Sequence, residues 1–259
     1  MDIFIFLFGL AVGSFLNCVI YRLETSQSFI KDRSFCPHCK HVLSWQDLIP
    51  VFSFIWLRGR CGYCQKKISW QYPIVEIATG LLFVLSFLRY DLLGRSYLLI
   101  FAIIPFLIII FVYDLKRYII PDKVIYPAIG IVLIYDLWMS WMSDIPWMSD
   151  ILISAFGAAA FFAAIVFGSR GRWMGAGDIK LAFLMGLVLG FPNILAALSL
   201  AFVLGAIMGV GLIILGKKTM KSEVPFGPFL VAGTLIALFW GHELINWYAK
   251  ISYFGVYSY

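Results

Sequence analysis

The stretch that decides the fold is YLLIFAIIPFLIIIFVYDLKR, residues 97–117. Residues 97–113 contain no charged side chain, and a run of roughly 17 to 25 apolar residues can cross the hydrocarbon core of a bilayer as a helix. The run ends in Asp114, Lys116 and Arg117, and such charges are typical of the membrane–water interface. The stretch therefore predicts a transmembrane helix with a carboxylate at its end.

The composition of the whole chain agrees with this prediction. Of its 259 residues, 62% are hydrophobic and 13% are charged, whereas a soluble domain usually has roughly 25% charged residues. This balance excludes an ordinary soluble enzyme. Aromatic residues make up 18% of the chain, which excludes intrinsic disorder because disordered chains are poor in such side chains. The expected solvent for most of the chain is the lipid bilayer.

The apolar runs predict an all-α polytopic membrane protein with about eight transmembrane helices. The first run starts without Lys or Arg and lacks a small-residue cleavage site, so we expect an uncleaved span and not a signal peptide. The block 179–216 is long enough for two helices, with a turn predicted at Gly190-Phe191-Pro192-Asn193. The expected spans are residues 3–20, 74–88, 97–113, 124–141, 151–168, two within 179–216, and 226–244.

Three parts are expected along the chain. Residues 1–20 form the first helix, residues 21–73 form a polar module, and residues 74–259 form a seven-helix core. The module is polar enough to lie outside the bilayer, because charged side chains are costly in lipid. We therefore expect a small insertion between the first two spans.

The basic residues predict the orientation. With the N-terminus outside, all of the 20 Lys and Arg residues except Arg89, Arg95 and Lys250 fall on inner segments, while the outer loop 144–150 is acidic. The positive-inside rule then places segment 21–73 in the cytoplasm. The pI near 9.0 reflects this topology, so no nucleic-acid partner is expected. The basic loops can contact anionic lipid head groups.

Two CxxC pairs lie in the polar segment, Cys36 with Cys39 and Cys61 with Cys64. Each pair can present two thiolates to one tetrahedral metal ion, although the intervening residues 40–60 slightly exceed the usual spacing of roughly 15 to 20 residues. Disulfides are the alternative, but they are rare in the reducing cytoplasm. The pattern predicts a structural zinc (Zn2+) site on these four cysteines. His38 and His41 are the histidines near enough to replace one of them.

Two carboxylates are expected at the cytoplasmic edge of the membrane. Asp114 ends one span, and Asp178 follows Gly175-Ala176-Gly177 at the start of another. Ionisable groups at the membrane are costly and tend to be functional. Two neighbouring carboxylates can divide the roles of acid and base because one of them keeps its proton. Such a pair can activate water to attack a peptide carbonyl.

The residues alone leave structural alternatives open. Asp178 directly precedes an apolar run and is a good helix N-cap. Asp114 fits an interfacial belt with the neighbouring bases, and Asp122 after Pro121 fits the start of the next helix. Asp136 is a further carboxylate within a predicted span, and the sequence suggests no partner for it.

Six motifs in order resemble those of the type 4 prepilin peptidases, and the similarity covers nearly the whole chain. Glu24 is a departure, because the family usually has proline there. The motifs are GSFLNCVIYRL at 13–23, the paired CxxC module, YPIVE at 72–76, Asp114 with IPD at 120–122, MGAGD at 174–178 and PFGP at 225–228.

The resemblance implies an intramembrane aspartyl protease of the GxGD class. Asp114 and Asp178 match the two catalytic aspartates of the family, which favours Asp114 over Asp122. The substrates implied are prepilins or pseudopilins, whose short basic leader is removed at the cytoplasmic face of the bacterial cell membrane. The residues expected to support the catalytic loop are Gly175, Gly177, Pro121 and Asp122.

The resemblance also implies a second activity. Family members with the cysteine module commonly N-methylate the new N-terminal residue, with S-adenosylmethionine as methyl donor. Glu76 and Gly80 are the expected contributors to that site, and packing at the start of a helix is the alternative for both. Two other functions stay open at this point: a peptidase without methyltransferase activity, and a membrane scaffold or transporter.

Overall fold

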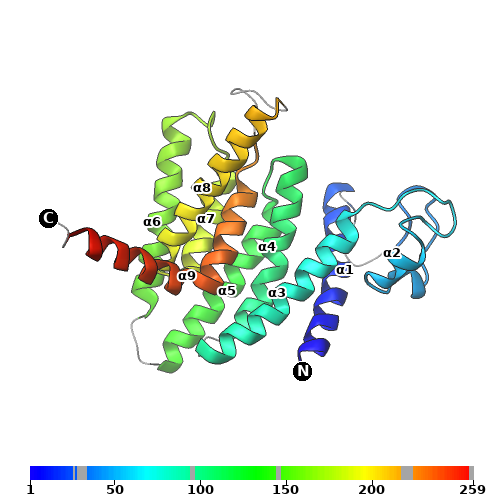
Figure 1. Ribbon diagram of the computed structural model, residues 1–259, viewed down its shortest axis with the longest axis horizontal. Coiled ribbons are helices and arrows are strands. Elements are labelled where there is room, and N and C mark those ends of the chain that lie inside the picture. Colours follow the sequence, from blue (N-terminus) through cyan, green and yellow to red (C-terminus); the bar gives the residue numbers. More distant parts are fainter. Residues whose placement is uncertain (26, 28–33, 94–96, 144–146, 217–223, 257–259) are drawn as a thin grey trace. The chain divides into compact units, whose positions relative to one another are not determined.

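The computed structural model describes residues 1–25, 27, 34–93, 97–143, 147–216 and 224–256. Within these ranges the regular structure is helical apart from two isolated β-bridges, so the predicted all-α fold class is confirmed. The helices are α1 (Asp2–Thr25), η1 (Gln46–Leu48), α2 (Phe52–Trp56), α3 (Gln71–Leu93), α4 (Tyr97–Arg117), α5 (Asp122–Ser143), α6 (Trp147–Gly168), α7 (Ala176–Leu189), α8 (Asn193–Ile214) and α9 (Gly227–Val256) (Figure 1).

All eight predicted apolar helices are present, but they differ in length. Over the described residues, seven helices are long and apolar enough to cross a membrane, namely α1, α3, α4, α5, α6, α8 and α9. The remaining apolar helix, α7, has 14 residues and is therefore about 21 Å long, shorter than the roughly 30 Å hydrocarbon core. The chain is therefore a multi-pass membrane protein, and among its eight apolar helices α7 is too short to span the bilayer alone.

The helix ends differ from the predicted spans in several places. Helix α1 continues to Thr25, whose hydroxyl donates to the carbonyl of Tyr21 at 2.9 Å, and α9 continues to Val256. Helix α3 begins at Gln71 and not at residue 74. These extensions mix polar, charged and aromatic residues with aliphatic ones, and a helix continues past the apolar run because its backbone bonds do not require lipid.

Part of the charge count that predicted the orientation concerns residues whose structure is not described. These residues are Lys31, Arg33, Arg95, Asp144, Lys217, Lys218 and Lys221. The orientation stays a prediction.

The chain forms two compact units, Met1–Ile109 and Ile110–Tyr259, which divide within α4. The first unit contains α1, the cysteine segment and α3, and the second contains α5 to α9. The three-part division 1–20, 21–73 and 74–259 describes topology and stays a prediction.

In the first unit, α1 and α3 pack closely at small residues. A Cβ on Gly9 would lie 2.7 Å from the Cα of Gly80, and a Cβ on Gly13 would lie 2.6 Å from the Cα of Glu76. Side-chain amides add polar contacts, since Asn17 donates to the carbonyl of Tyr72 at 3.0 Å. Small residues allow such close packing, which holds helices together where lipid removes the hydrophobic driving force.

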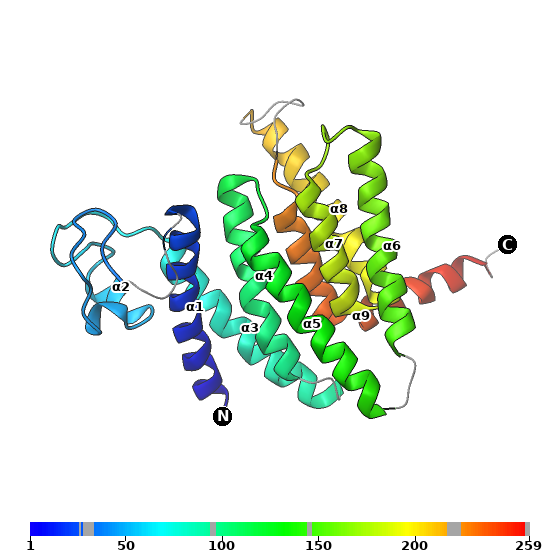
Figure 2. The ribbon, with the colours of Figure 1, turned by 180° about the vertical axis from the view of Figure 1, so that it is seen from behind.

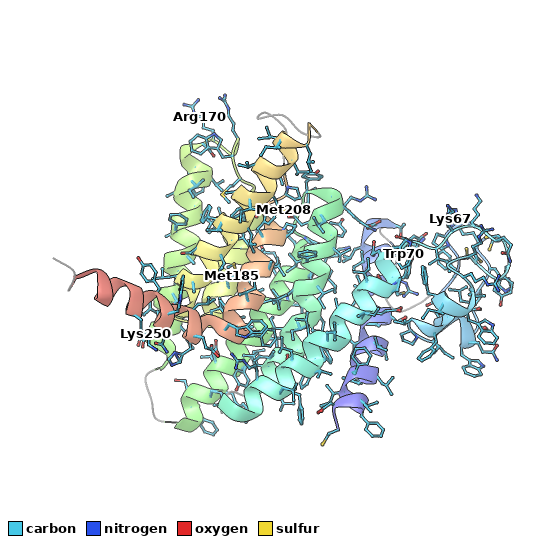
Figure 3. All side chains as sticks on the ribbon, in the orientation of Figure 1. Lys67, Trp70, Arg170, Met185, Met208 and Lys250 are labelled. Carbon is cyan, nitrogen blue, oxygen red and sulfur yellow. The ribbon has the colours of Figure 1, made fainter. Side chains whose placement is uncertain are left out.

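In the second unit, the short helix α7 is the core. It packs against α5, α6, α8 and α9, as Figures 1 and 2 show for the helix labelled α7. A Cβ on Gly186 would overlap the backbone of Ala155 on α6, and Met185, labelled in Figure 3, is fully buried. Because other helices surround α7, it need not be long enough to span the bilayer.

The close packing of α1 on α3 predicts the effect of a larger side chain at its centre. Gly13→Val would force the two backbones apart, and overpacking of this kind typically costs about 1–3 kcal/mol. We expect a lower unfolding temperature for the purified protein in detergent. Gly209→Val is the matched control, because a Cβ there meets nothing within 4 Å. Equal unfolding temperatures for the two variants would contradict the packing argument.

Candidate active site and cysteine cluster

Asp114 is buried although it lies in the last turn of α4. Only 5% of it is exposed, whereas the next residues, Leu115 to Arg117, are exposed. The alternative that Asp114 belongs to a surface charge belt is therefore wrong. Helix α4 ends just beyond it, where Tyr118 takes a positive φ of 59° and donates its N–H to the carbonyl of Asp114 at 2.8 Å.

Asp178 lies inside the first turn of α7 and is not its N-cap. The helix begins at Ala176 with Gly175 as N-cap, so the N-cap alternative is wrong. The carboxylate of Asp178 accepts the N–H of Gly175 at 3.3 Å, and 8% of the residue is exposed. A carboxylate in the first turn of a helix also interacts favourably with the helix dipole.

The second unit brings the two carboxylates together. Asp178 lies close enough to Asp114 for the two carboxyl groups to interact electrostatically. Gly227, the first residue of α9, donates its N–H to Asp114, and a Cβ on Gly227 would lie 2.5 Å from Asp114 Oδ2. Ends of three helices, α4, α7 and α9, therefore form the site.

Gly227 was not among the predicted site residues. The sequence analysis noted the motif Pro225-Phe226-Gly227-Pro228 as part of the family resemblance. The sequence alone does not show that Gly227 lies next to Asp114. Aromatic packing fixes this turn, because the ring of Phe226 lies 5.2 Å from that of Phe202 and 6.2 Å from that of Phe162. The start of α9 is thus held where the backbone of Gly227 reaches Asp114.

The turn after Asp114 packs against the start of α7. Ile120 is buried, and a Cβ on Gly177 would lie 3.0 Å from the Cβ of Ile120. Pro121 supplies the carbonyl that accepts the first backbone bonds of α5. The absence of a side chain at Gly177 therefore lets this turn approach the loop that carries Asp178.

An ion pair joins the same two segments. Lys180 Nζ lies 2.6 Å from Asp122 Oδ1 and 5.0 Å from the centre of the Tyr126 ring. Asp122 is the first residue of α5, which confirms the alternative that it starts the helix after Pro121. Lys180 was missed because its partner is distant in the chain, so no local spacing connects the two.

Asp136 lies half-buried within α5. It belongs to a different part of α5 from Asp122, whose carboxylate faces Lys180 at the helix start. We assign it no role in the aspartate site.

The arrangement has the chemistry of a carboxylate pair. When two carboxyl groups share a site, repulsion between them favours the state in which one is ionised and the other protonated. Such a pair offers a base and an acid at one point. Both groups lie in a largely water-excluded environment, where electrostatic effects on a reacting carbonyl are strong.

The four cysteines of the first unit form a compact cluster. The Sγ atoms of Cys36, Cys39, Cys61 and Cys64 all lie within 4.8 Å of one another. Four sulfur atoms bound to one tetrahedral ion at about 2.3 Å lie roughly 3.8 Å apart. The cluster therefore fits one tetrahedral metal ion after a small contraction.

Two equivalent turns present these thiols. Cys36 donates its N–H to His41 and accepts that of Lys40, while Cys61 donates to Lys66 and accepts that of Gln65, each at 2.9 Å. Lys40 and Gln65 have nearly the same positive φ, 59° and 58°. The repeated geometry indicates that both CxxC pairs are shaped for one ligand.

The surroundings of Cys36 favour the ionised form of its thiol. Burial opposes ionisation of Cys36, but hydrogen bonds from the backbone of Cys39 and His38 and from neighbouring thiols lower its pKa to about 7. His41 instead stacks on Tyr63, with ring centres 3.7 Å apart. Four thiols complete the cluster without a histidine.

Glu76 and Gly80 have packing contacts in the first unit. The carboxylate of Glu76 accepts the N–H of Val51 at 2.8 Å and a hydrogen bond from Ser14. Gly80 faces Gly9 and the ring of Phe6. These contacts fit the packing alternative, and the assignment of both residues to a methyl-donor site stays a prediction.

Comparison with known proteins decides the family. Residues 7–90 match the bacterial peptidase A24 N-terminal domain, and residues 101–210 match the type IV leader peptidase family. The chain belongs to the type IV leader peptidase family. This membership confirms the resemblance drawn from the six motifs, and it confirms that the chain is an enzyme.

Relatives in this family cover almost the full chain. A prepilin leader peptidase/N-methyltransferase of Aeromonas hydrophila is 33% identical over 94% of this chain and 92% of its own length. One of Bacillus subtilis (strain 168) is 31% identical over 96% of this chain and 98% of its own length. One of Myxococcus xanthus (strain DK1622) is 35% identical over 85% of this chain and 66% of its own length. No solved structure shows a significant match to the chain.

Proposed function

We propose that this chain removes the short basic leader of type IV prepilins or pseudopilins, with Asp114 and Asp178 as the catalytic pair. The observation that carries the proposal is the burial of both carboxylates at one point of a peptidase of this family. Water and the scissile carbonyl react there without a covalent intermediate. Membership in a peptidase family argues against the scaffold or transporter alternative.

The two carboxylates act as base and acid in turn. The ionised carboxylate takes a proton from water, whose oxygen attacks the scissile carbonyl, while the protonated carboxyl donates to the carbonyl oxygen. When the tetrahedral intermediate collapses, a proton passes to the leaving amine and the C–N bond breaks. The N–H of Gly227 holds the carboxylate of Asp114 in place.

The reaction takes place at the cytoplasmic face of the bacterial cell membrane. The positive-inside distribution of Lys and Arg supports this side, and the end of α4 meets the starts of α5, α7 and α9 near the aspartates, which puts the pair at the ends of these helices. A basic leader lies in the cytoplasm while the apolar helix of the pilin stays in lipid. The bond between them then reaches the carboxylates at the interface.

Methylation of the new N-terminal amine is the second proposed activity. The relatives named above are N-methyltransferases as well as leader peptidases, and S-adenosylmethionine is the methyl donor that we propose. Glu76 and Gly80 remain the proposed contributors. A peptidase that lacks methyltransferase activity is the alternative.

Zinc is the proposed ligand of the cysteine cluster. The donor set of four thiols, their mutual approach within 4.8 Å and the repeated turns support it. Cys36, Cys39, Cys61 and Cys64 would hold the ion, and its role is to stabilise the segment between α1 and α3.

Replacing either aspartate tests the catalytic pair. Asp114→Asn or Asp178→Asn removes one member of the acid–base pair, so we expect leader cleavage to fall by at least about 10³-fold, a range typical for loss of acid–base function. Mass spectrometry of a prepilin incubated with membranes and S-adenosylmethionine reads cleavage and methylation together. Cleavage retained by either variant, present in the membrane at the parent level, would refute the pair.

A pilin that already lacks its leader separates the two activities. With this substrate, Asp178→Asn should add the methyl mass as well as the parent does, because the amine is already free. If the parent cleaves prepilin but adds no methyl mass to either substrate, the peptidase-only alternative is correct.

The two glycines of the GxGD motif should differ. Gly177→Ala places a Cβ 3.0 Å from that of Ile120, which shifts the loop carrying Asp178, and small displacements in an active site cost on the order of 10–10² in rate. Gly175→Ala is the matched control: its support of the loop is the backbone N–H to Asp178, which alanine keeps, and its Cβ would meet only Gly177 N at 3.9 Å. We expect a large loss of cleavage for the first and near-parent cleavage for the second; the reverse order would be incompatible with the contact to Ile120.

Metal analysis tests the cysteine cluster. The purified parent should contain about one zinc ion per chain, and Cys61→Ser should lose it because the closed four-thiol site becomes incomplete. Acidification should also promote release, since protons compete with the metal for thiolates. Cys18→Ser is the control and should keep the zinc. A parent protein without zinc would disprove the proposal.

A further inference from the structure

The cysteine segment carries an exposed apolar surface that neither leader cleavage nor the metal site uses. On α2, Phe52, Ile55 and Trp56 are 66%, 66% and 88% exposed. Their spacing of i, i+3 and i+4 places them on one helical face. Phe54 turns the other way and packs on Trp70, with ring centres 5.1 Å apart. The large apolar side chains of α2 thus face outward as well as inward.

The exposed surface continues along the chain before α2. Helix η1 packs against α2, and Trp45, Leu48 and Ile49 are also exposed. Residues 45–56 contain no Lys or Arg, and their one acid, Asp47, accepts hydrogen bonds from Ser44 and Tyr63. An apolar patch of this kind marks a binding surface. We call these six residues the apolar face: Trp45, Leu48, Ile49, Phe52, Ile55 and Trp56.

One hydrogen bond sets the level of the apolar face along α3. The N–H of Val51, immediately before α2, donates to Glu76 Oε2 at 2.8 Å. Glu76 follows the first residue of α3, Gln71, by five positions, which is about 7.5 Å along a helix. Helix α2 therefore lies beside a membrane-spanning helix and not beyond its end. Figures 1 and 2 show α2 to the side of α1 and not beyond its end.

The backbone is strained at Val51, the residue whose N–H binds Glu76. Val51 has φ 61°, and Phe52 donates its N–H to the carbonyl of Pro50 at 2.6 Å, which closes a γ-turn. A positive φ is unfavourable for a β-branched residue, and γ-turns of this hand are rare. The buried carboxylate of Glu76 offsets the strain by accepting the N–H, so the turn before α2 is connected to α3.

The opposite side of the segment is polar. Figure 3 shows Lys67 projecting from the side away from α2, and Lys67 is the β-bridge partner of Arg60. Both residues are exposed. These two exposed bases thus lie on the side away from α2, while Arg58, two residues after Trp56 in the chain, is an exposed base at the end of the apolar face.

We propose that the apolar face lies in the bilayer, at the boundary between head groups and acyl chains. Interfacial helices bury their apolar side about 5–10 Å into this region, and the bond from Val51 to Glu76, in the second turn of α3, holds α2 near this end of the span. Trp is favoured there because its ring is amphipathic. Ile74 and Ile77, on either side of Glu76 in α3, are also exposed, as expected for the lipid-facing side of a span. The direct bond from the turn before α2 to this membrane-spanning helix favours lipid over a pilin or a second copy of the chain.

Photo-crosslinking in membranes tests the proposal. Trp56 is replaced by p-benzoylphenylalanine, and Lys67 is replaced in the same way as the matched control, because both side chains are exposed but lie on opposite sides. After illumination, mass spectrometry of the protein should show phospholipid adducts several-fold more abundant for position 56 than for position 67. Resistance to limited proteolysis checks the fold of each variant, and position 52 replaces position 56 if that variant fails the check.

Two results would overturn the proposal. Equal phospholipid adducts at positions 56 and 67 would mean that the apolar face has no special contact with lipid. Adducts at position 56 only to a second copy of the chain or to a co-expressed pilin would mean that a protein covers the face. Neither result depends on whether Asp114 and Asp178 catalyse cleavage, so failure here leaves the proposed function unaffected.

Discussion

The burial of α7 is the constraint on which the second unit depends. A 14-residue helix cannot span the bilayer alone, so it is stable there only because α5, α6, α8 and α9 surround it. The close approach at Gly186 and Ala155 allows this packing. Burial of the helix also carries Asp178 out of solvent, toward Asp114. The length of α7 and the position of the aspartate pair are therefore two consequences of the same packing.

A second buried carboxylate organises the first unit. Glu76 has a structural role, because it accepts the N–H of a strained Val51 and so connects the cysteine segment to α3. The segment thus has two anchors of different kinds, the thiol cluster within it and the carboxylate beside it. The cluster holds the two halves of the segment together, and the carboxylate connects the segment to α3.

Local patterns predicted much of the fold and site because the relevant information is local in the chain. Apolar runs located the eight helices, and the paired CxxC motif located the four thiols. Asp178 and Gly177 followed from MGAGD, and Asp114 from the resemblance. Lys180 and Gly227 could not be found in this way, because their contacts to Asp122 and Asp114 join segments that are distant in sequence.

By itself, the sequence determined that this is a multi-pass α-helical membrane protein of the type IV leader peptidase family, since hydropathy and motifs need no partner segment. Only the tertiary structure decided that α7 is a buried core helix, that Asp114 is buried rather than part of a charge belt, and that α2 lies beside α3. These properties depend on which helices are neighbours. Hydropathy reports the preference of a segment for an apolar environment, but lipid and protein both supply one, and only packing distinguishes them.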